Sequence, residues 1–449
     1  MIYVLYFFVF WIILPLLLYL PAVCFIDPYI GIHTSGSILL QMSKIAPFML
    51  TAGIIIYLYA AEELFKFGRG LPISAKPPTH LVETGMYFWF RHPLYIGFNI
   101  ILFSIALWSK SIGFIITSGP FLLALWLIYS VAEERVLKKR YGNTYRRYAE
   151  ETGVLFPSMY SLLRLMLLPA FRFFFKLQFI NASVIPKQGA FYMISLHRSF
   201  LDPLLISAGI DRKIHFLTTS SMYRRTITRL FFTLIQTISI ARYKRNIRGI
   251  RKSLEILNSG GIVGIFPEGG RSWYGETVYA KSSIELMKKH PYPVVAVEVI
   301  DSFSFYPRFS KFPKREKLKV KYTFYEKASL ELERIIGILA QREKTRDSLE
   351  RRKKIPMDSR GIEELLFFCP SCGKLFTMHG FKNGTIKCSS CGSSFTLIKG
   401  KAIINKNGKV SALREIETNN IQRLKKIDSI TIYISCKYSI NFGKYKDGE

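Results

Sequence analysis

The chain has 449 residues, of which 49% are apolar and 15% aromatic, and it carries a formal charge of +32 at pH 7. The apolar content is typical of membrane proteins, but a chain confined to the bilayer would not carry such a charge. Residues 1–155 hold 12 Lys and Arg against 8 Asp and Glu, so about +28 belongs to the remainder, which favours an anionic lipid surface or a nucleic acid as partner. The apolar first part of the chain favours the lipid surface.

Four apolar segments near the N-terminus predict membrane-spanning helices. Residues 2–26 carry no charge and are long enough to cross a bilayer. A cleaved signal peptide is the alternative, but this segment lacks a basic start and is too long for the apolar part of a signal. The other three segments are 37–60, 93–108 and 112–131.

The distribution of basic residues predicts the orientation of these segments. The loop 27–36 has no Lys or Arg, whereas the loop 62–92 has four. The segment after the last span has six by residue 147. The positive-inside rule therefore predicts a multi-pass protein of the cell (inner) membrane, with both termini and everything after residue 132 in the cytoplasm.

Acidic residues lie at the predicted membrane edge. Glu133 and Glu134 follow the last span, and Arg91-His92-Pro93 opens the span before it. Carboxylates at membrane depth are costly and are functional by default, although ordinary helix-end residues are the alternative. The stretches "TGMYFWFRHPLYIG" and "EERVLKKRYGNTYRRY" resemble the isoprenylcysteine carboxyl methyltransferase and phospholipid methyltransferase group, over about 45–156.

This resemblance implies an S-adenosylmethionine site at the cytoplasmic face. A glutamate and aromatic faces suit a cationic sulfonium. The acceptor would enter from the lipid and is left open: an amine headgroup, a carboxylate, or none if this half is only an anchor. By position, the cofactor-binding candidates are Gly85, Tyr87, His92, Tyr95 and Glu134.

The next segments predict an interfacial helix and then an α/β domain. Residues 162–178 are too short and too basic to span, and Arg164, Arg172 and Lys176 share one helix face, which favours a helix lying in the membrane interface over an ordinary core helix. Buried strands and helices alternate after it. We predict strands at 190–196, 261–267, 293–300 and 318–325, and helices at 222–238 and 247–258.

Two motifs in this domain indicate a site with a general base and a phosphate-binding arginine. His197 and Asp202, in "MISLHRSFLDPLLI", can act as a general base and the carboxylate that orients it. No protein nucleophile accompanies them, so the attacking group should be a substrate hydroxyl. "GIVGIFPEGGRS" follows, and its Arg271 can bind a phosphate bidentately.

Together these motifs resemble the lysophosphatidic acid (glycerolipid) acyltransferase family, over about 160–340. "SIAR", which ends at Arg242, and "PVVAVEV" resemble further blocks of that family. The resemblance implies transfer of a fatty acyl group from acyl-CoA or acyl-carrier protein to a glycerophosphate hydroxyl. Leu196 and Ser282 depart from the family pattern and leave the acceptor open. The implied roles are base for His197, orientation for Asp202, phosphate binding for Arg271 and Arg242, and shaping of the acceptor site for Glu268 with Gly269.

Four of the six cysteines predict a zinc ribbon. Cys369, Cys372, Cys388 and Cys391 form CxxC-x15-CxxC, and four thiolates at that spacing indicate a closed, structural zinc site. Cys24 and Cys436 stand alone, so a disulfide framework is excluded and a reducing compartment is indicated. The partner of the ribbon is left open between nucleic acid and anionic lipid.

The sequence therefore predicts a multi-domain membrane enzyme of phospholipid synthesis. An α-helical bundle of about four spans precedes an α/β acyltransferase domain and a small β zinc ribbon. One alternative is a methyltransferase whose acyltransferase domain only binds lipid; another is a membrane-anchored zinc-ribbon adaptor that binds nucleic acid or protein. Oligomeric state is left open. The expected domains are 1–156 (methyltransferase-like), 157–340 (acyltransferase), 341–364 (charged linker), 365–405 (zinc ribbon) and 406–449 (basic tail).

Overall fold

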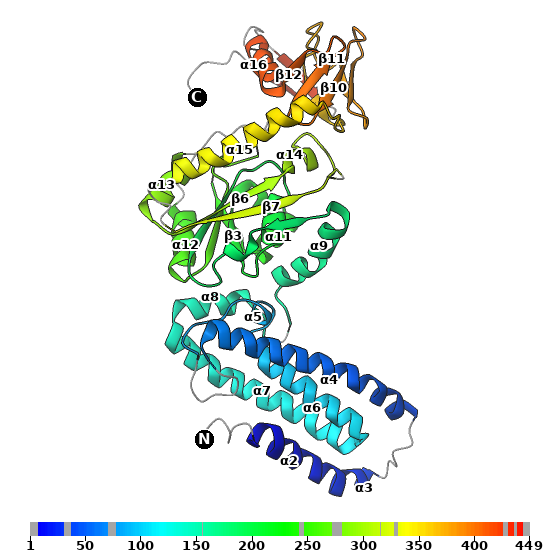
Figure 1. Cartoon of the computed structure of the whole chain (residues 1–449), viewed down its shortest axis with the longest axis vertical. Coiled ribbons are helices and arrows are strands. Elements are labelled where there is room, and N and C mark those ends of the chain that lie inside the picture. Colours follow the sequence, from blue (N-terminus) through cyan, green and yellow to red (C-terminus); the bar gives the residue numbers. More distant parts are fainter. Residues whose placement is uncertain are drawn as a thin grey trace. The chain divides into compact units, whose positions relative to one another are not determined.

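A computed structural model of the chain shows a helical N-terminal region, an α/β domain and a C-terminal β module (Figure 1). The chain divides into two compact units. The first comprises Met1–Pro169, Ser183–Met193 and Ser207–Gly264, and the second comprises Ala170–Ala182, Ile194–Ile206 and Ile265–Glu449. The structure describes residues 8–30, 37–70, 78–154, 156–241, 247–271, 281–314, 316–326, 331–424, 430–434 and 438–442.

The N-terminal region is helical because its segments are long and apolar, and the helices α4 and α7 continue through an internal proline, Pro47 and Pro120 respectively. Pro93 starts one helix at a position where its missing N–H costs nothing. Ser111 caps the next by accepting the N–H of Phe114 at 3.0 Å, and Asp27 accepts the Ser111 hydroxyl at 2.6 Å. The helices are η1 (Val9–Ile13), α2 (Leu14–Pro21), η2 (Ala22–Ile26), α3 (Asp27–Ile30), α4 (Ser37–Glu63), η3 (Leu64–Gly68), α5 (Met86–Trp89), α6 (Pro93–Ser109), α7 (Ile112–Tyr141) and α8 (Asn143–Glu151).

Two candidate membrane spans are found among the described residues, rather than the predicted four. By length and composition, Trp11–Tyr29 and Gln41–Gly68 can cross a bilayer. The apolar helices Pro93–Ser109 and Ile112–Ala124 are shorter. Large apolar side chains such as Leu17, Phe48 and Ile128 are exposed, which suits a helical region in contact with lipid.

The α/β domain is built on a seven-stranded sheet with the order β1-β7-β6-β2-β5-β3-β4. Its neighbours β3–β4 and β3–β5 are parallel, and β6–β7 is antiparallel. The four predicted strands and the helix predicted at 247–258 are confirmed. The helix predicted at 222–238 is shorter, because α11 spans Thr226–Leu234 and Ile238 already belongs to β4. β2 and β5 are buried throughout, as strands covered on both faces must be. The strands are β1 (Gln178–Ile180), β2 (Phe191–Ser195), β3 (Ile214–Thr219), β4 (Ile238–Ile240), β5 (Ile262–Ile265), β6 (Val294–Ile300) and β7 (Lys319–Tyr325).

Helices connect these strands. The segment predicted to lie in the membrane interface forms α9, and Leu165, Met166 and Phe173 on it are exposed. The helices are α9 (Met159–Phe175), η4 (Ala182–Val184), α10 (Asp202–Ser207), η5 (Ser220–Tyr223), α11 (Thr226–Leu234), α12 (Ile247–Asn258), α13 (Lys281–Lys289), α14 (Ser302–Phe305) and α15 (Leu332–Lys353).

The C-terminal module is a five-stranded antiparallel sheet with the order β12-β11-β10-β9-β8. Its apolar core includes Leu397 and Ile403 and also takes in Phe303 and Phe309, so it continues into the segment that follows β6. Its elements are η6 (Ile362–Glu364), β8 (Met378–Gly380), β9 (Thr385–Cys388), β10 (Ser394–Ile398), β11 (Ala402–Asn405), β12 (Val410–Ala412) and α16 (Leu413–Leu424). β13 (Ile430–Ile434) and β14 (Tyr438–Phe442) form a separate two-stranded sheet.

Candidate functional site

The histidine and aspartate of the H-x4-D motif are in contact. His197 follows β2, and Asp202 is the first residue of α10. The Asp202 carboxylate is fully buried and lies 3.1 Å from His197 Nδ1. It also accepts the N–H groups of Arg198 and Ser199, each at 2.7 Å, and the hydroxyl of Ser302. An Nδ1–H donated to Asp202 leaves the lone pair on Nε2, which is the tautomer that a general base needs.

The glutamate and glycine of the second motif lie against the same loop. Glu268 follows β5, and its Oε2 accepts the N–H of His197 at 2.7 Å. Burial raises the pKa of Glu268 to about 7, although Arg198 and the His197 N–H favour the charged form. Gly269 has a φ of 68°, which a residue with a Cβ rarely adopts. The turn at Gly269 thus presents Glu268 to the loop that carries the histidine.

Aromatic rings connect the two motifs. The Phe266 ring stacks on the His197 imidazole with centroids 4.1 Å apart. The Arg271 guanidinium carbon lies 5.5 Å from the centroid of the Phe200 ring. Phe200 lies between His197 and Asp202 in the chain, so Arg271 is held beside the dyad. This apolar wall agrees with the apolar sequence around His197.

Arg271 is a half-buried cation without a carboxylate. Its guanidinium contacts the Phe200 ring but makes no ion pair with any residue in the described part of the chain, and its backbone carbonyl accepts a hydrogen bond from Arg308 at 3.0 Å. Burial lowers the pKa of Arg271. Such an arginine is suited to an anionic ligand. Arg242, the other predicted phosphate ligand, lies outside the described residues.

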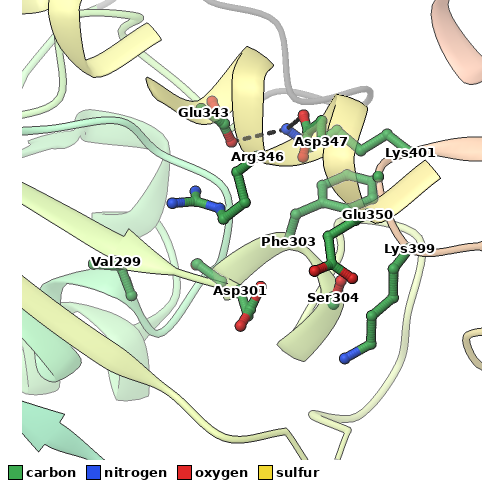
Figure 2. Close-up of a pocket in the computed structure, with 12 residues that line it drawn as sticks. Val299, Asp301, Phe303, Ser304, Glu343, Arg346, Asp347, Glu350, Lys399 and Lys401 are labelled. Atoms are coloured by element: carbon green, nitrogen blue, oxygen red, sulfur yellow. Dashed lines mark hydrogen bonds and ion pairs between the residues drawn. The ribbon is translucent and has the colours of Figure 1, made fainter. Parts of the chain in front are cut away.

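A buried ion-pair chain beside the dyad was not predicted. Arg198 binds Glu268 through Nη1 and Glu343 through Nη2, the latter at 2.6 Å. Glu343 also pairs with Lys401 at 2.8 Å (Figure 2). Burial by itself raises the pKa of Glu343, but Lys401 and Arg198 outweigh it and lower that pKa to about 2. Glu343 continues the buried positions 332, 335, 336, 339 and 340 of α15, and this helical spacing could have identified it.

The candidates for the methyltransferase-like site lie around the start of α6, where His92 is the N-cap, and beside the last two turns of α7, which begin near Glu134. His92 Nδ1 is 3.2 Å from Glu133, and its Nε2 is 3.7 Å from Glu134. The Tyr95 ring stacks on the His92 ring at 5.7 Å. Arg91 binds Glu134 at 2.8 Å. The nearby His92, followed by Arg91 and Lys138, lowers the pKa of Glu134 to about 2.

Two further observations fit a ligand at this place. His92 is buried, and its Nε2 has no hydrogen bond to any described residue. Gly85 has a φ of 59°, and a Cβ on it would lie 2.6 Å from the side chain of Glu63, which the sequence did not single out. Tyr87 is buried among Tyr145 and Tyr148 and accepts the Tyr148 hydroxyl through its carbonyl at 2.8 Å. The residues present thus offer S-adenosylmethionine an acidic and aromatic lining with one imidazole nitrogen that has no hydrogen bond and only a 3.7 Å contact with Glu134.

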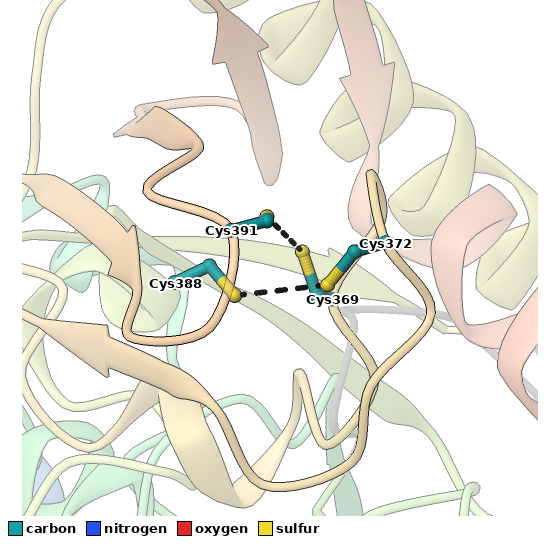
Figure 3. A group of neighbouring side chains, drawn as sticks. All are labelled: Cys369, Cys372, Cys388 and Cys391. Carbon is teal, nitrogen blue, oxygen red and sulfur yellow. Dashed lines mark hydrogen bonds between the residues drawn. The ribbon is translucent and has the colours of Figure 1, made fainter.

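The four cysteines converge as predicted (Figure 3). Their sulfur atoms all lie within 4.8 Å of one another, with Cys369–Cys391 at 3.8 Å and Cys372–Cys388 at 3.9 Å. Four thiolates bound to zinc at about 2.3 Å in a tetrahedron stand about 3.8 Å apart. The donor set and its spacing therefore fit a structural zinc ion of a zinc ribbon.

Comparison with known proteins gives two family matches. Residues 176–300 match the family described as acyltransferase, and residues 42–144 match the family described as phospholipid methyltransferase. Both resemblances predicted from the motifs are confirmed at this level. The chain is similar to the crystal structure of the 1-acyl-sn-glycerophosphate (LPA) acyltransferase PlsC from Thermotoga maritima, with 19% identity and a TM-score of 0.34, over 40% of this chain and 80% of that chain. No curated protein matches the chain.

Proposed function

We propose that the chain transfers a fatty acyl group from a thioester, acyl-CoA or acyl-carrier protein, to the hydroxyl of a lysophosphatidic acid-type glycerophosphate. The observation that carries this proposal is the contact of His197 with a buried Asp202 beside Arg271, a cation without a described ion-pair partner. An acyltransferase match over residues 176–300 supports it.

His197 is the proposed general base. Asp202 holds the Nδ1–H, so Nε2 takes the proton of the acceptor hydroxyl while its oxygen attacks the thioester carbonyl. The carbon–sulfur bond then breaks, and the imidazolium returns the proton to the leaving thiolate. The products are an ester and a free thiol, and no acyl-enzyme forms. Arg271, with Arg242, binds the acceptor phosphate, and Glu268 with Gly269 shapes the acceptor site.

Arg271→Gln should raise the KM for lysophosphatidic acid by about 10–100-fold, because hydrogen bonds to charged groups contribute about 1.5–3 kcal/mol. The rate with monoacylglycerol, which has no phosphate, should change little. Initial rates with both acceptors in membranes that contain the chain measure this difference.

Arg251→Gln is the matched control, because Arg251 is a surface arginine on α12 whose side chain is 81% exposed. It should behave like the wild type. If Arg271→Gln lowers the rate equally with lysophosphatidic acid and with monoacylglycerol, Arg271 does not bind the phosphate. The proposal of a glycerophosphate acceptor would then be wrong.

Methyl transfer is a second candidate activity. The match of residues 42–144 and the buried His92 Nε2 without a hydrogen bond favour it. When bound, S-adenosylmethionine supplies an electrophilic methyl group. Glu134 and the Tyr95 ring would hold the cationic sulfonium, and His92 would donate to or accept from the cofactor at Nε2. The acceptor enters sideways from the lipid.

Glu134→Gln should weaken binding of S-adenosylmethionine by about 10–100-fold, since a half-buried carboxylate is lost opposite a cation. Retention of labelled S-adenosylmethionine by the purified protein measures the affinity. Glu150→Gln is the control, because Glu150 is exposed at the end of α8. Retention that is absent in the wild type, or that Glu134→Gln leaves unchanged, contradicts this second activity.

The proposed membrane arrangement keeps four spans. α6 and α7 are apolar like the two candidate spans, and basic residues gather in the last turn of α7. Both sites then face the cytoplasm. The zinc ion of the ribbon is structural in this scheme.

A further inference from the structure

The turn between β10 and β11 of the ribbon carries a buried lysine. Lys401 is only 4% exposed, and its Nζ lies 2.8 Å from both Glu343 and Asp347 on α15 (Figure 2). The adjacent Gly400 has a φ of 83°, and a Cβ on it would lie 2.4 Å from the Asp347 carbonyl oxygen. A lysine in a hairpin turn is ordinarily solvated, and burying its charge is costly unless it is paired. The turn is therefore fitted closely against α15.

Glu343 connects Lys401 to the acyl-transfer site, because it binds both Lys401 and Arg198. Its Oε1 binds Lys401, and both of its oxygens bind Arg198 Nε, at 2.8 and 3.1 Å. Arg198 binds Glu268 through its remaining arm. All four side chains are at most 10% exposed, so each charge depends on its neighbours rather than on water.

The chain of charges ends on the backbone of the dyad. Glu268 Oε2 accepts the N–H of His197 at 2.7 Å. The N–H of Arg198 donates to Asp202 Oδ2 at 2.7 Å. The series of ion pairs from Lys401 through Glu343, Arg198 and Glu268 thus holds the backbone N–H of His197. The backbone of Arg198 also holds the carboxylate of Asp202, which orients the imidazole.

A second route from the ribbon runs through residues 302–314. Phe303 and Phe309 belong to the apolar core of the ribbon, and Lys401 Nζ lies 5.4 Å from the centroid of the Phe303 ring. The neighbouring Ser302 donates to Asp202 Oδ1, and Arg308 donates to the Arg271 carbonyl at 3.0 Å. Asp202 and Arg271 are therefore both hydrogen-bonded to the segment 302–314, which packs into the ribbon.

We propose that the zinc ribbon is a positioning part of the acyl-transfer site, and that Lys401, Glu343 and Arg198 are positioning residues that hold His197 and Glu268 in place. This inference rests on the proposed acyl transfer. It gives the ribbon a role inside its own chain, in place of an outside nucleic-acid or lipid partner. None of the three residues touches substrate, and they act through the backbone of the dyad.

Lys401→Met tests the proposal, because it keeps most of the length of the side chain and removes the charge. Displacing a catalytic group by about 1 Å costs about 100-fold in rate, so kcat for acyl transfer should fall by about 10–100-fold. The KM for lysophosphatidic acid should stay within about twofold, because Arg271 is untouched. Zinc content by elemental analysis should remain equal to that of the wild type, which shows that the ribbon is folded.

Lys399→Met is the matched control in the same turn. Lys399 pairs with Glu316 at 2.7 Å. Among the described residues, its side chain forms no ion pair with Glu343, Arg198 or Glu268. It should leave kcat and KM unchanged. Equal kcat values for Lys401→Met, Lys399→Met and the wild type overturn the inference while leaving acyl transfer itself intact. A wild type without acyl transfer contradicts the proposed function instead.

A double variant keeps the test decisive if Lys401→Met loses zinc. Lys401→Met with Glu343→Leu removes both charges, and a buried ion pair replaced by apolar residues is often tolerated. Zinc content should then return, but kcat should remain 10–100-fold low because Arg198 has lost Glu343. If zinc content and kcat return together, the ribbon supports only the fold and the positioning role is wrong.

Discussion

Replacing His197 with Ala should lower the rate of acyl transfer by about 10²–10⁴, the usual contribution of a positioned general base. The variant retains Arg271 and the Phe266–Phe200 wall, so the KM for lysophosphatidic acid should change little. Initial rates at saturating thioester and acceptor measure the loss. Asp202→Asn should lose less, because the imidazole remains but its tautomer is no longer fixed.

His379→Ala is the control for this substitution. His379 is an exposed histidine on β8 in the same compact unit. Its loss should leave the rate unchanged. Equal rates for the two histidine variants and the wild type would remove the base from the mechanism.

Removal of zinc should unfold the ribbon, because structural zinc sites contribute about 10–16 kcal/mol of apparent folding free energy at pH 7. A chelator or the substitution Cys372→Ser should abolish zinc binding and open residues 365–405 to limited proteolysis. The core that the ribbon shares with Phe303 and Phe309 should become exposed with it.

Cys24→Ser is the matched control, since Cys24 is far from the cluster in sequence and belongs to the other unit. It should retain one zinc ion and the cleavage pattern of the wild type. A chelated chain that resists protease as well as the zinc-loaded chain would show that the four cysteines do not hold a structural metal ion.

The adaptor alternative makes a different forecast for the acyl-transfer residues. There, His197, Asp202 and Arg271 are dispensable, while loss of a zinc ligand abolishes the function of the chain. Because loss of a zinc ligand harms the chain in both accounts, the substitutions at His197, Asp202 and Arg271 separate an enzyme from a zinc-ribbon adaptor.

Parts of the fold and of the site that are formed by residues close to one another in the sequence were predictable. The H-x4-D spacing places His197 after a buried strand and Asp202 at the start of the next helix, so one short loop brings them into contact. The four cysteines likewise come from two tight turns whose spacing is characteristic of zinc. The apolar runs at 190–196 and 261–267 predicted β2 and β5 because such runs suit strands buried on both faces.

Contacts between distant residues were not predictable. Arg198 and Glu343 are separated by 145 positions, and no local pattern relates them. The charge-rich composition of 341–364 suggested a linker, but composition does not show which face of a helix is buried. α15 begins at Leu332 and buries Glu343 along its apolar face. Four spans were predicted because the sequence has four apolar runs. Two of those runs, Pro93–Ser109 and Ile112–Ala124, form apolar helices that are shorter than the two candidate spans.

A double-label assay tests the central claim most directly. Purified protein would receive a thioester with a ¹³C-labelled acyl chain together with deuterated lysophosphatidic acid. The account predicts one product that carries both labels, release of one free thiol per product, and loss of that product in His197→Ala but not in His379→Ala. A doubly labelled product formed equally well by His197→Ala, or its absence from the wild type, would contradict the account.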